Sequence, residues 1–298
     1  MELTVVGSVA LDTVETPLGK NVEGLGGAAT FFSLAAANYV PVHMVACVGQ
    51  DFPDEHVSLL KSKQINLEGL EVMEGNTFRW AGRYHQDMNN RDTLDTQLNV
   101  FEQFHPKLPA AAQQAPFLFL ANIHPALQLE VLEQSKATFK GLDTMNLWIE
   151  SELDQLKKVL AQVDALIIND SEVELLTGER NLMKGARAIE KMGPRTVVIK
   201  KGEHGCLLVQ GEQIFIVPAF LLEEVVDPTG AGDSFAGGFM GYLAQLGDTS
   251  FDSLKKAIVH GAVVASFTCE KFGPDQVAAI TEQDIARRFE LFKQMTAF

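Results

Sequence analysis

The sequence has few cysteines, few basic residues and no long hydrophobic run. Its three cysteines, Cys47, Cys206 and Cys269, lie far apart without paired spacing. They argue against a disulfide scaffold and a cysteine zinc site, and reducing cytoplasm is the expected location. Lys and Arg number 24 against 39 Asp and Glu, which gives a formal net charge of -15. We therefore expect no nucleic-acid partner, because the summed field repels a phosphate backbone.

No segment is long and apolar enough to predict a membrane span. The longest apolar stretches, such as residues 117–121 and 262–267, fall far short of the ~18 residues that a bilayer requires. Residues 1–9 carry Glu2 and lack both a basic segment and a long apolar stretch, so no secretion signal is expected. The 298 residues are 46% hydrophobic and 21% charged, which is typical of a chain that buries a core.

Short β-rich runs alternate with helical patterns along most of the chain. Strand-then-helix units are predicted in residues 3–38, 42–63, 117–134, 138–162 and 165–176. This alternation predicts an α/β fold with a mostly parallel sheet and helices on both faces. Closely spaced β-like runs within residues 195–217 predict meander strands at one edge, and the chain after residue 230 is predicted to be helical.

One segment breaks this alternation. Residues 77–84 alternate in the manner of a strand, and the polar residues 87–95 after them predict a turn and loop without a helix. We expect a small separate sheet from residues 13–22 and about 74–99, set on a single domain that spans residues 1–298. Two interpretations of this sheet remain open, a lid over a binding site and a plain edge hairpin.

The most informative stretch runs from Asp227 to Asp233 and reads Asp-Pro-Thr-Gly-Ala-Gly-Asp. Here a turn signal precedes Gly230, Ala231 and Gly232 at a predicted helix start. Amides of small residues at a helix N-terminus, together with the helix dipole, predict an anion site. Asp233 is explained either as a helix cap or as a general base, and its place beside an anion site favours the base.

This motif resembles the C-terminal signature of the ribokinase-like, or pfkB, carbohydrate kinases. The resemblance implies a three-layer α/β/α fold with a small β lid. It also implies an ATP-dependent kinase that phosphorylates a hydroxyl of a sugar or sugar derivative. Asp233 is then the catalytic base, and the amides of Gly230, Ala231 and Gly232 hold the charge of the transferring phosphoryl group.

The resemblance extends to the nucleotide side. Asn169 and Glu172, directly after the strand predicted at residues 165–168, are similar to the family's Asn-x-x-Glu motif, which organises Mg²⁺ and its waters. Without that context, a strand end with a helix cap explains both residues. The resemblance places the nucleotide near Lys201, Gly202, Gly205, Thr229, His260 and Gly261. ATP and Mg²⁺ are the implied cofactors, and K⁺ is a further candidate with Asp227 at its site.

On the acceptor side, Asp12 matches the acidic residue that binds sugar hydroxyls in the family, and Gly26 and Gly27 match its Gly-Gly substrate turn. The sequence departs from the family five residues after the first of these glycines, where Phe31 replaces the usual Asn. Two interpretations of Phe31 remain open. It either joins the core or lines an unusually apolar pocket.

The small sheet supplies two further candidates for contact with the acceptor, Arg79 and Trp80. Because neighbours on a strand point to opposite faces, only one of them can face the acceptor. Aromatic side chains stack on bases as well as on sugar rings, so a nucleoside is the alternative to a sugar as the substrate. A homodimer formed through this sheet is a further expectation.

Other protein classes fit the sequence less well. Residues 24–29 match a dinucleotide-binding glycine pattern but lie too far after the first predicted strand. Residues 232–236 loosely imitate a hydrolase nucleophile elbow, yet no apolar strand leads directly into them. No P-loop sequence occurs. A catalytically silent relative that binds a nucleotide or a sugar is the remaining alternative to an enzyme.

Overall fold

Within residues 1–297, which the computed structural model describes, nine strands form the central sheet. They are β1 (Leu3–Val6), β4 (Val42–Gly49), β5 (Ile65–Met73), β8 (Phe117–Leu120), β9 (Phe139–Asp143), β10 (Ala165–Asn169), β11 (Thr196–Lys200), β12 (Cys206–Gln210) and β13 (Gln213–Val217). Their order is β13-β12-β11-β10-β9-β8-β1-β4-β5. All neighbours from β11 to β5 pair in parallel, whereas β12 and β13 are antiparallel additions at one edge.

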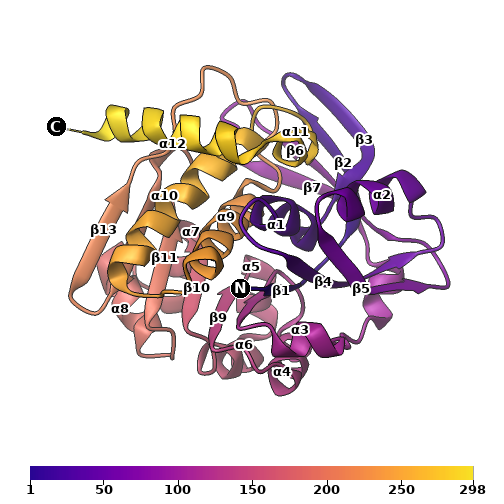
Figure 1. Cartoon of the computed structure of the whole chain (residues 1–298), viewed down its shortest axis with the longest axis horizontal. Helices are drawn as coiled ribbons and strands as arrows, with labels where there is room; N and C mark the ends of the chain where they lie inside the picture. The colour runs from indigo at the N-terminus through magenta and orange to yellow at the C-terminus, as the bar shows by residue number, and fades with distance from the viewer. Residues whose placement is uncertain (298) are drawn as a thin grey trace.

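Helices cover both faces of this sheet (Figure 1). One face packs against α1 (Ala28–Ala36), α2 (Asp54–Ser62), α9 (Ala231–Leu246), α10 (Phe251–Thr268), α11 (Asp275–Ala279) and α12 (Glu282–Thr296). The other packs against α3 (Ala110–Gln114), α4 (Pro125–Gln134), α5 (Asn146–Ser151), α6 (Leu153–Leu160), α7 (Asp170–Thr177), α8 (Leu182–Glu190) and the 3-10 turn η1 (Asn99–Gln103). A second 3-10 turn, η2 (Gly202–His204), follows β11.

The central strands are apolar on both sides because each side faces a helical layer. In β8, Phe117 and Phe119 belong to one hydrophobic core, and Leu118 and Leu120 belong to the other. Successive side chains of a strand point to opposite faces, so a continuous apolar run fills two cores. Only the loops beyond the strand ends are therefore free to carry polar chemistry.

Four strands form a second, smaller sheet within the same residues. They are β2 (Ala10–Thr16), β3 (Gly19–Gly26), β6 (Phe78–Tyr84) and β7 (Arg91–Gln97), in the order β3-β2-β6-β7. β2 and β6 are parallel, and the two outer pairs are antiparallel. The sheet lies at the end of the molecule away from β13 (Figure 1). Because only residues 7–9 separate β1 from β2, the small sheet is anchored at the carboxyl end of a central strand.

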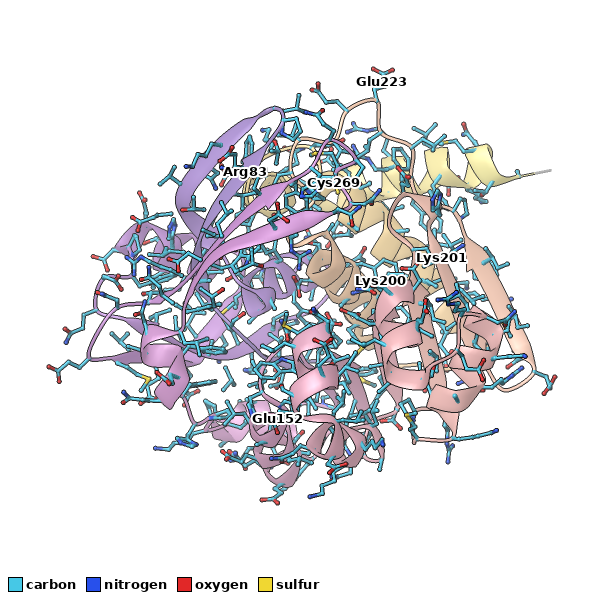
Figure 2. The ribbon with its side chains drawn as sticks, turned by 180° about the vertical axis from the view of Figure 1, so that it is seen from behind. Arg83, Glu152, Lys200, Lys201, Glu223 and Cys269 are labelled. Carbon is cyan, nitrogen blue, oxygen red and sulfur yellow. The ribbon has the colours of Figure 1, made fainter. Side chains whose placement is uncertain are left out.

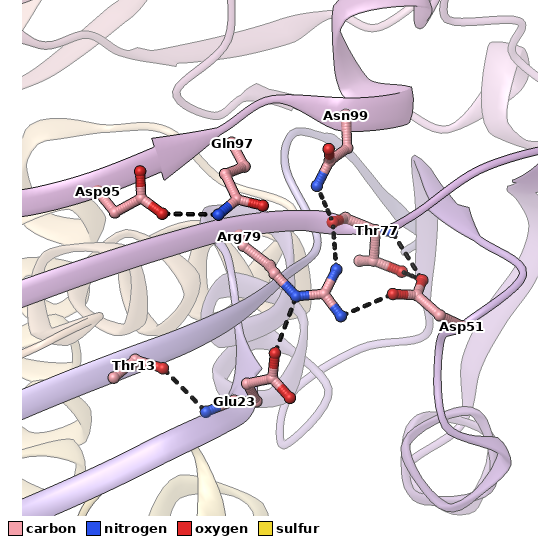
Figure 3. A network of polar contacts seen from close by, with 8 residues as sticks. All are labelled: Thr13, Glu23, Asp51, Thr77, Arg79, Asp95, Gln97 and Asn99. Atoms are coloured by element: carbon pink, nitrogen blue, oxygen red, sulfur yellow. Dashed lines mark hydrogen bonds and ion pairs between the residues drawn. The ribbon is translucent and has the colours of Figure 1, made fainter.

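A polar network joins the small sheet to the loop after β4 (Figure 3). Arg79 of β6 donates hydrogen bonds to Glu23 Oε1 at 3.0 Å and to Asp51 Oδ2 at 2.7 Å. Asp51 Oδ1 also accepts from the backbone N and the Oγ1 of Thr77, both at 2.7 Å. Asn99 Nδ2 donates to the carbonyl oxygen of Thr77 at 2.9 Å. Arg79 therefore fixes β3 and β6 against the main body.

The structure confirms the predicted fold class, an α/β protein with a large, mostly parallel sheet and a second small sheet. It also corrects the extent of that small sheet, because its first two strands cover residues 10–26 rather than 13–22. β5 and α8 were not expected from the sequence, and residues 91–95, predicted to be turn and loop, belong to strand β7. β5 is an edge strand with Val72 exposed and Gly69 in its middle, so its apolar signal is weak. None of the helices in residues 1–297 combines the length and apolar character needed to cross a bilayer.

Candidate active site

Polar side chains gather where neighbouring parallel strands end. Asp143, Asn169 and Lys200 are the last residues of β9, β10 and β11, and the register pairs Asn169 directly with Lys200. In Figure 2, Lys200 and Lys201 lie toward the middle of the molecule, whereas the exposed Glu223 projects from its rim. The crevice beyond the carboxyl ends of parallel strands is where open α/β sheets bind ligands.

The loop before α9 depends on a glycine packed against an aromatic ring. Gly230 is the N-cap residue of α9 and has a φ of 75°, a conformation that glycine adopts without strain. A Cβ atom at this position would lie 2.3 Å from Cγ of Phe31, so the ring packs directly on the glycine backbone. Phe31 is 2% exposed. It therefore belongs to the core, and it supports the predicted anion site from below.

The same loop is held from its other side by Asp227. Its Oδ1 accepts from the backbone N of Thr229 at 2.9 Å, and its Oδ2 accepts from the backbone N of Gly273 at 3.1 Å. Burial raises the pKa of this carboxyl. Thr229 Oγ1 in turn donates to the hydroxyl of Tyr84 at 3.3 Å, which joins the loop to β6 of the small sheet.

The amides at the start of α9 divide into two groups. The N–H of Ala231 donates to the carbonyl oxygen of Pro228 at 3.2 Å, so it takes part in the turn. The next N–H groups of the first turn belong to Gly232 and Asp233, and an α-helix leaves such donors without a helical acceptor. The dipole of the 16-residue helix adds to their positive potential. These two amides best fit the predicted anion site, whose role stays a prediction.

Asp233 lies in the first turn of α9 within a cluster of charged side chains. Its pKa is raised to about 7, chiefly by burial and also by the negative charge of Asp143, whereas the positive charges of Lys200 and Arg91 lower it. Part of the residue remains open to solvent, as a base that meets a substrate requires. A carboxyl that titrates near neutral pH is suited to accept a proton from an alcohol.

The residues predicted to bind the acceptor lie close to Asp233. Burial raises the pKa of Asp12 to about 7, the N–H of Gly27 lowers it, and the negative charges of Asp227 and Asp233 raise it. A Cβ atom at Gly26 would lie 2.0 Å from Asp12 Oδ2, so glycine is needed for the carboxylate to rest there. The structure therefore brings Asp12, Gly26 and Gly27 together beside Asp233.

Asn169 and Glu172 form the helix cap that the simpler interpretation of their spacing predicted. Asn169 Oδ1 accepts from the backbone N of Glu172 at 2.8 Å, and Glu172 Oε2 accepts from the backbone N of Asn169 at 3.0 Å. This capping box begins α7. Burial also raises the pKa of Glu172 to about 7, and Asp143 adds to the effect. The cap and a metal role are compatible, because a carboxylate has lone pairs to spare.

The turn after β11 lies under the tip of the small sheet. Lys201 precedes η2, and both Gly202 and Gly205 have positive φ values of 52° and 83°. A Cβ atom at Gly202 would come within 2.8 Å of Oδ1 of Asn89, which lies in the loop between β6 and β7. The small sheet therefore reaches the turn that the resemblance places at the nucleotide.

His260 and Gly261 have packing roles in the structure. The His260 ring stacks on Tyr242 at 3.8 Å between centroids, and its Nδ1 lies 3.0 Å from the hydroxyl oxygen of Tyr39. Burial lowers the pKa of His260 to about 4, so the ring is neutral at physiological pH. A Cβ atom at Gly261 would lie 2.8 Å from the carbonyl oxygen of Phe235, so the glycine permits close packing of α9 and α10. Their contact with adenine stays a prediction.

The two candidates from the small sheet point in opposite directions. Trp80 pairs in register with Asp12 across the parallel β2–β6 ladder, so both side chains project from the same face. Tyr84 lies on that face too, and it reaches Thr229. Arg79 projects from the other face, where Glu23 and Asp51 bind its guanidinium. Trp80 is therefore the one that faces the site.

Sequence reasoning missed two cations of the site, Lys200 and Arg91. Lys200 Nζ lies 3.8 Å from Asp143 Oδ2. Arg91 begins β7 opposite Tyr84, and its guanidinium carbon lies 5.7 Å from the centre of the Trp80 ring. The signal for Lys200 was its position as the last residue of a predicted strand. That strand was expected in an edge meander, whereas β11 pairs in parallel with β10 and so brings Lys200 to the crevice. Arg91 gave no such signal, because its approach depends on the pairing of β6 with β7.

Comparison with known proteins agrees with this architecture. The model of the pfkB family of carbohydrate kinases matches residues 2–280. A cytidine kinase of Thermococcus kodakarensis is 30% identical over 246 residues, with 80% of this chain and 87% of the relative covered. A deoxyribokinase of Salmonella typhi is 28% identical, with 88% and 92% covered. The crystal structure of the Methanocaldococcus jannaschii nucleoside kinase has a TM-score of 0.78 at 21% identity and covers 97% of this chain and 98% of its own.

The fold and the charged crevice define a phosphotransferase with an alcohol group as acceptor. The chain belongs to the pfkB family of carbohydrate kinases. It is an ATP-dependent small-molecule kinase that phosphorylates a hydroxyl of a sugar or sugar derivative.

Because burial raises the pKa of Asp233 to about 7, the folded protein holds a proton there that the unfolded chain releases near pH 4. The stabilising effect of that proton is complete below about pH 4 and is lost as the pH rises through about 7. We expect Asp233→Asn to stabilise the fold at pH 8 by about 1–2 kcal/mol and to change its stability little at pH 4. The expected gain is smaller than the full pKa shift corresponds to, because part of the site is solvated. Urea unfolding at the two pH values measures the difference.

Asp154→Asn is the matched control, since Asp154 is also in a first helical turn but is exposed. The control should change stability by less than about 0.5 kcal/mol at either pH. Loss of stability in Asp233→Asn at pH 8 would show that the carboxylate is not a destabilising buried charge.

Proposed function

We propose that the chain phosphorylates the hydroxymethyl group of a nucleoside, using ATP with Mg²⁺, and that free sugars are poorer acceptors. The observation that carries this proposal is the position of Trp80 beside Asp12 on the face of the small sheet that looks toward Asp233. We place the activity in the cytoplasm. The three free cysteines support that location.

Asp12 and Trp80 supply complementary parts of an acceptor site. A buried carboxylate accepts hydrogen bonds from vicinal hydroxyls, as a ribose ring presents them. The Trp80 indole lies across Gly82, where a Cβ atom would come within 2.2 Å of its Cη2, so the ring rests flat along β6. An aromatic face next to the hydroxyl-binding carboxylate is suited to stack on the base of the same molecule.

The replacement of the family's Asn by Phe31 supports the same substrate class. Phe31 is packed beneath Gly230 and supplies no polar group to a sugar. An acceptor that loses one hydroxyl contact needs another source of affinity, and stacking on Trp80 provides it. The similarity to a cytidine kinase agrees with this choice.

The reaction assigns separate tasks to the two ends of the crevice. Asp12 orients the sugar ring so that its hydroxymethyl oxygen approaches Asp233. Asp233 accepts the hydroxyl proton while that oxygen bonds to the terminal phosphorus of ATP and the bond from this phosphorus to the bridging oxygen of ADP breaks. The amides of Gly232 and Asp233 stabilise the charge on the transferring group. The small sheet excludes water, which would otherwise accept the phosphoryl group.

The residues at the start of α7 fit a magnesium ion that is shared with phosphates. Glu172 offers a carboxylate, a ligand that Mg²⁺ prefers. Asn169 Oδ1 already accepts from the backbone N of Glu172 and from Ser171 Oγ, so Asn169 would act on a metal-bound water rather than on the ion itself. Among residues 1–297 no group of three or more His, Cys, Asp or Glu side chains is arranged to hold a metal by itself. The ion would therefore be held through waters and phosphate oxygens as well as by Glu172. When bound, it neutralises charge between the phosphates.

A monovalent cation such as K⁺ beside the anion site also remains a proposal. Asp227 is the residue proposed to attract it, because its carboxylate is 1% exposed and lies at the loop before α9. Its oxygens already accept from Thr229 and Gly273. A cation would share those oxygens and would stiffen the loop.

We also propose that two copies of the chain pair through the small sheet. Leu18, Val22 and Leu94 of this sheet are each at least half exposed. Leu18 lies in the turn between β2 and β3, and Val22 and Leu94 lie in the two edge strands β3 and β7. Exposed apolar side chains favour burial against a second surface.

A panel assay with purified protein tests the proposed substrate. With ATP and Mg²⁺, we expect kcat/KM for at least one of cytidine, uridine, adenosine and inosine to exceed that for ribose, fructose and deoxyribose by about tenfold or more, the worth of one stacked base. Phosphorus NMR of the product should show a phosphomonoester on the hydroxymethyl group. A free sugar that outperforms every nucleoside would contradict the proposal. Asp233→Asn, expected to lower kcat by roughly 10²- to 10⁴-fold, reports the background rate.

Glu172→Gln separates a metal role from a capping role, because Gln preserves a capping box. We expect the variant to fold normally and to need about tenfold more Mg²⁺, or more, for half-maximal rate. Magnesium titrations of the initial rate give this value. Glu174→Gln, the same change at an exposed position of α7, is the control. If the titration of Glu172→Gln matches that of the wild type, the residue serves only as a cap.

Trp80→Ala tests the contact with the base. We expect its KM for a nucleoside to rise about tenfold or more while its KM for ATP changes little, because only acceptor stacking is lost. Arg79→Ala is the counterpart from the opposite face. It should lower thermal stability through loss of the pairs with Glu23 and Asp51. If the acceptor KM rises in Arg79→Ala and not in Trp80→Ala, the assignment of Trp80 to the acceptor site is wrong.

A further inference from the structure

Lys200 is a buried cation that the sequence analysis left without a role. It ends β11, its side chain is 20% exposed, and its Nζ lies 3.8 Å from Oδ2 of Asp143. That distance is an ion-pair distance and exceeds the length of a full hydrogen bond. An ammonium has three N–H donors, so this contact leaves it able to bind another anion.

The surroundings of Lys200 keep it charged. Burial opposes its charge, but the carboxylates of Asp143, Glu172 and Asp233 together raise its pKa. Each of these acids belongs to a different element, namely β9, α7 and α9. A protonated lysine is therefore held at the point where the strand ends and the start of α9 converge.

Lys200 also reaches the start of α9 directly. A Cβ atom at Gly232 would lie 3.0 Å from its Nζ, so the ammonium sits against the backbone of the residue that carries a first-turn N–H. The positive end of a helix and a lysine ammonium thus face the same small volume, and the base Asp233 is next in the chain. An anion in this volume would meet both positive groups and would lie beside the base.

We propose that Lys200 is a catalytic residue whose ammonium binds the terminal phosphoryl group of ATP, and that Asp143 is the residue that positions it. The inference rests on the proposed function, in which Asp233 is the base that receives the acceptor proton. The phosphoryl group next to the base must be the one that is transferred. We therefore assign the terminal phosphate of ATP, and not its two inner phosphates, to Lys200. As the bond to ADP breaks and the bond to the acceptor oxygen forms, the ammonium offsets the charge on the phosphoryl oxygens, while the hydroxyl proton goes to Asp233.

Calorimetric binding of ATP and of ADP, each with Mg²⁺ and without acceptor, tests this assignment. ADP lacks only the phosphate that Lys200 is proposed to bind. We expect Lys200→Met to weaken ATP binding by about 10- to 100-fold, the worth of one charge-assisted hydrogen bond, and ADP binding by less than about threefold. Lys200→Arg should recover part of the loss, because it keeps the charge.

Two further variants serve as controls for this experiment. Lys158→Met removes a lysine that is exposed in the last turn of α6, before β10 begins, and should bind both nucleotides as the wild type does. Lys200→Met alone leaves three carboxylates without their cation and risks misfolding. The double variant Lys200→Met/Asp143→Asn removes both members of the pair, keeps the local charge balanced, and should show the same selective loss of ATP.

The outcomes separate this inference from the proposed function. Equal losses of ATP and ADP, or no loss of either in a folded variant, overturn the assignment of Lys200. Selective loss of ATP binding supports it even if the acceptor turns out not to be a nucleoside. A wild-type protein that binds neither nucleotide overturns the use of ATP, and the role of Lys200 falls with it.

Discussion

Burial of carboxylates at the ends of apolar strands is the constraint on which the rest of the site depends. The strands β9, β10 and β11 are filled with apolar side chains on both faces, so water reaches the crevice only beyond their carboxyl ends. Asp143, Glu172 and Asp233 meet there, and desolvation raises the pKa of Glu172 and of Asp233 to about 7. Several negative charges close together cost free energy where water is scarce. The positive charge of Lys200 offsets part of that cost. The same cost brings the pKa of Asp233 to about 7, so the proposed role as a base and the local instability have one cause.

The predicted anion site depends on backbone geometry rather than on side chains, and that geometry depends on packing. Gly230 adopts its left-handed conformation over the ring of Phe31, and Asp227 holds the preceding turn. Phe31, which stands where the family has a polar Asn, thus also supports the loop before α9. A substitution that restores an Asn at Phe31 would regain a hydroxyl contact but would leave Gly230 without the surface on which it rests.

Much of the fold was predictable from the sequence, because a strand buried on both faces has a short, continuous apolar signal that differs from the helical period. The strand predicted at residues 165–168 is β10, and the break in the alternation at residues 77–84 marks β6 of the small sheet. The residues of the Asp227–Asp233 motif were also identified, since their chemistry is local in sequence. Lys200 and Arg91 were not, because each acts through neighbours that only strand pairing brings near. β5 was missed for the same reason, since its pairing with β4 and not its own pattern makes it a strand.

The small sheet contacts both sides of the crevice. Through Tyr84 it contacts Thr229 at the anion site, and through Asn89 it lies against Gly202 in the turn after β11. The small sheet also acts through charge, since Arg91 of β7 lowers the pKa of both Asp233 and Glu172. Any movement that lifts the sheet from the body removes a positive charge and adds water around these acids at once. The position of the small sheet is therefore coupled to the electrostatics of Asp233 and of Glu172 together.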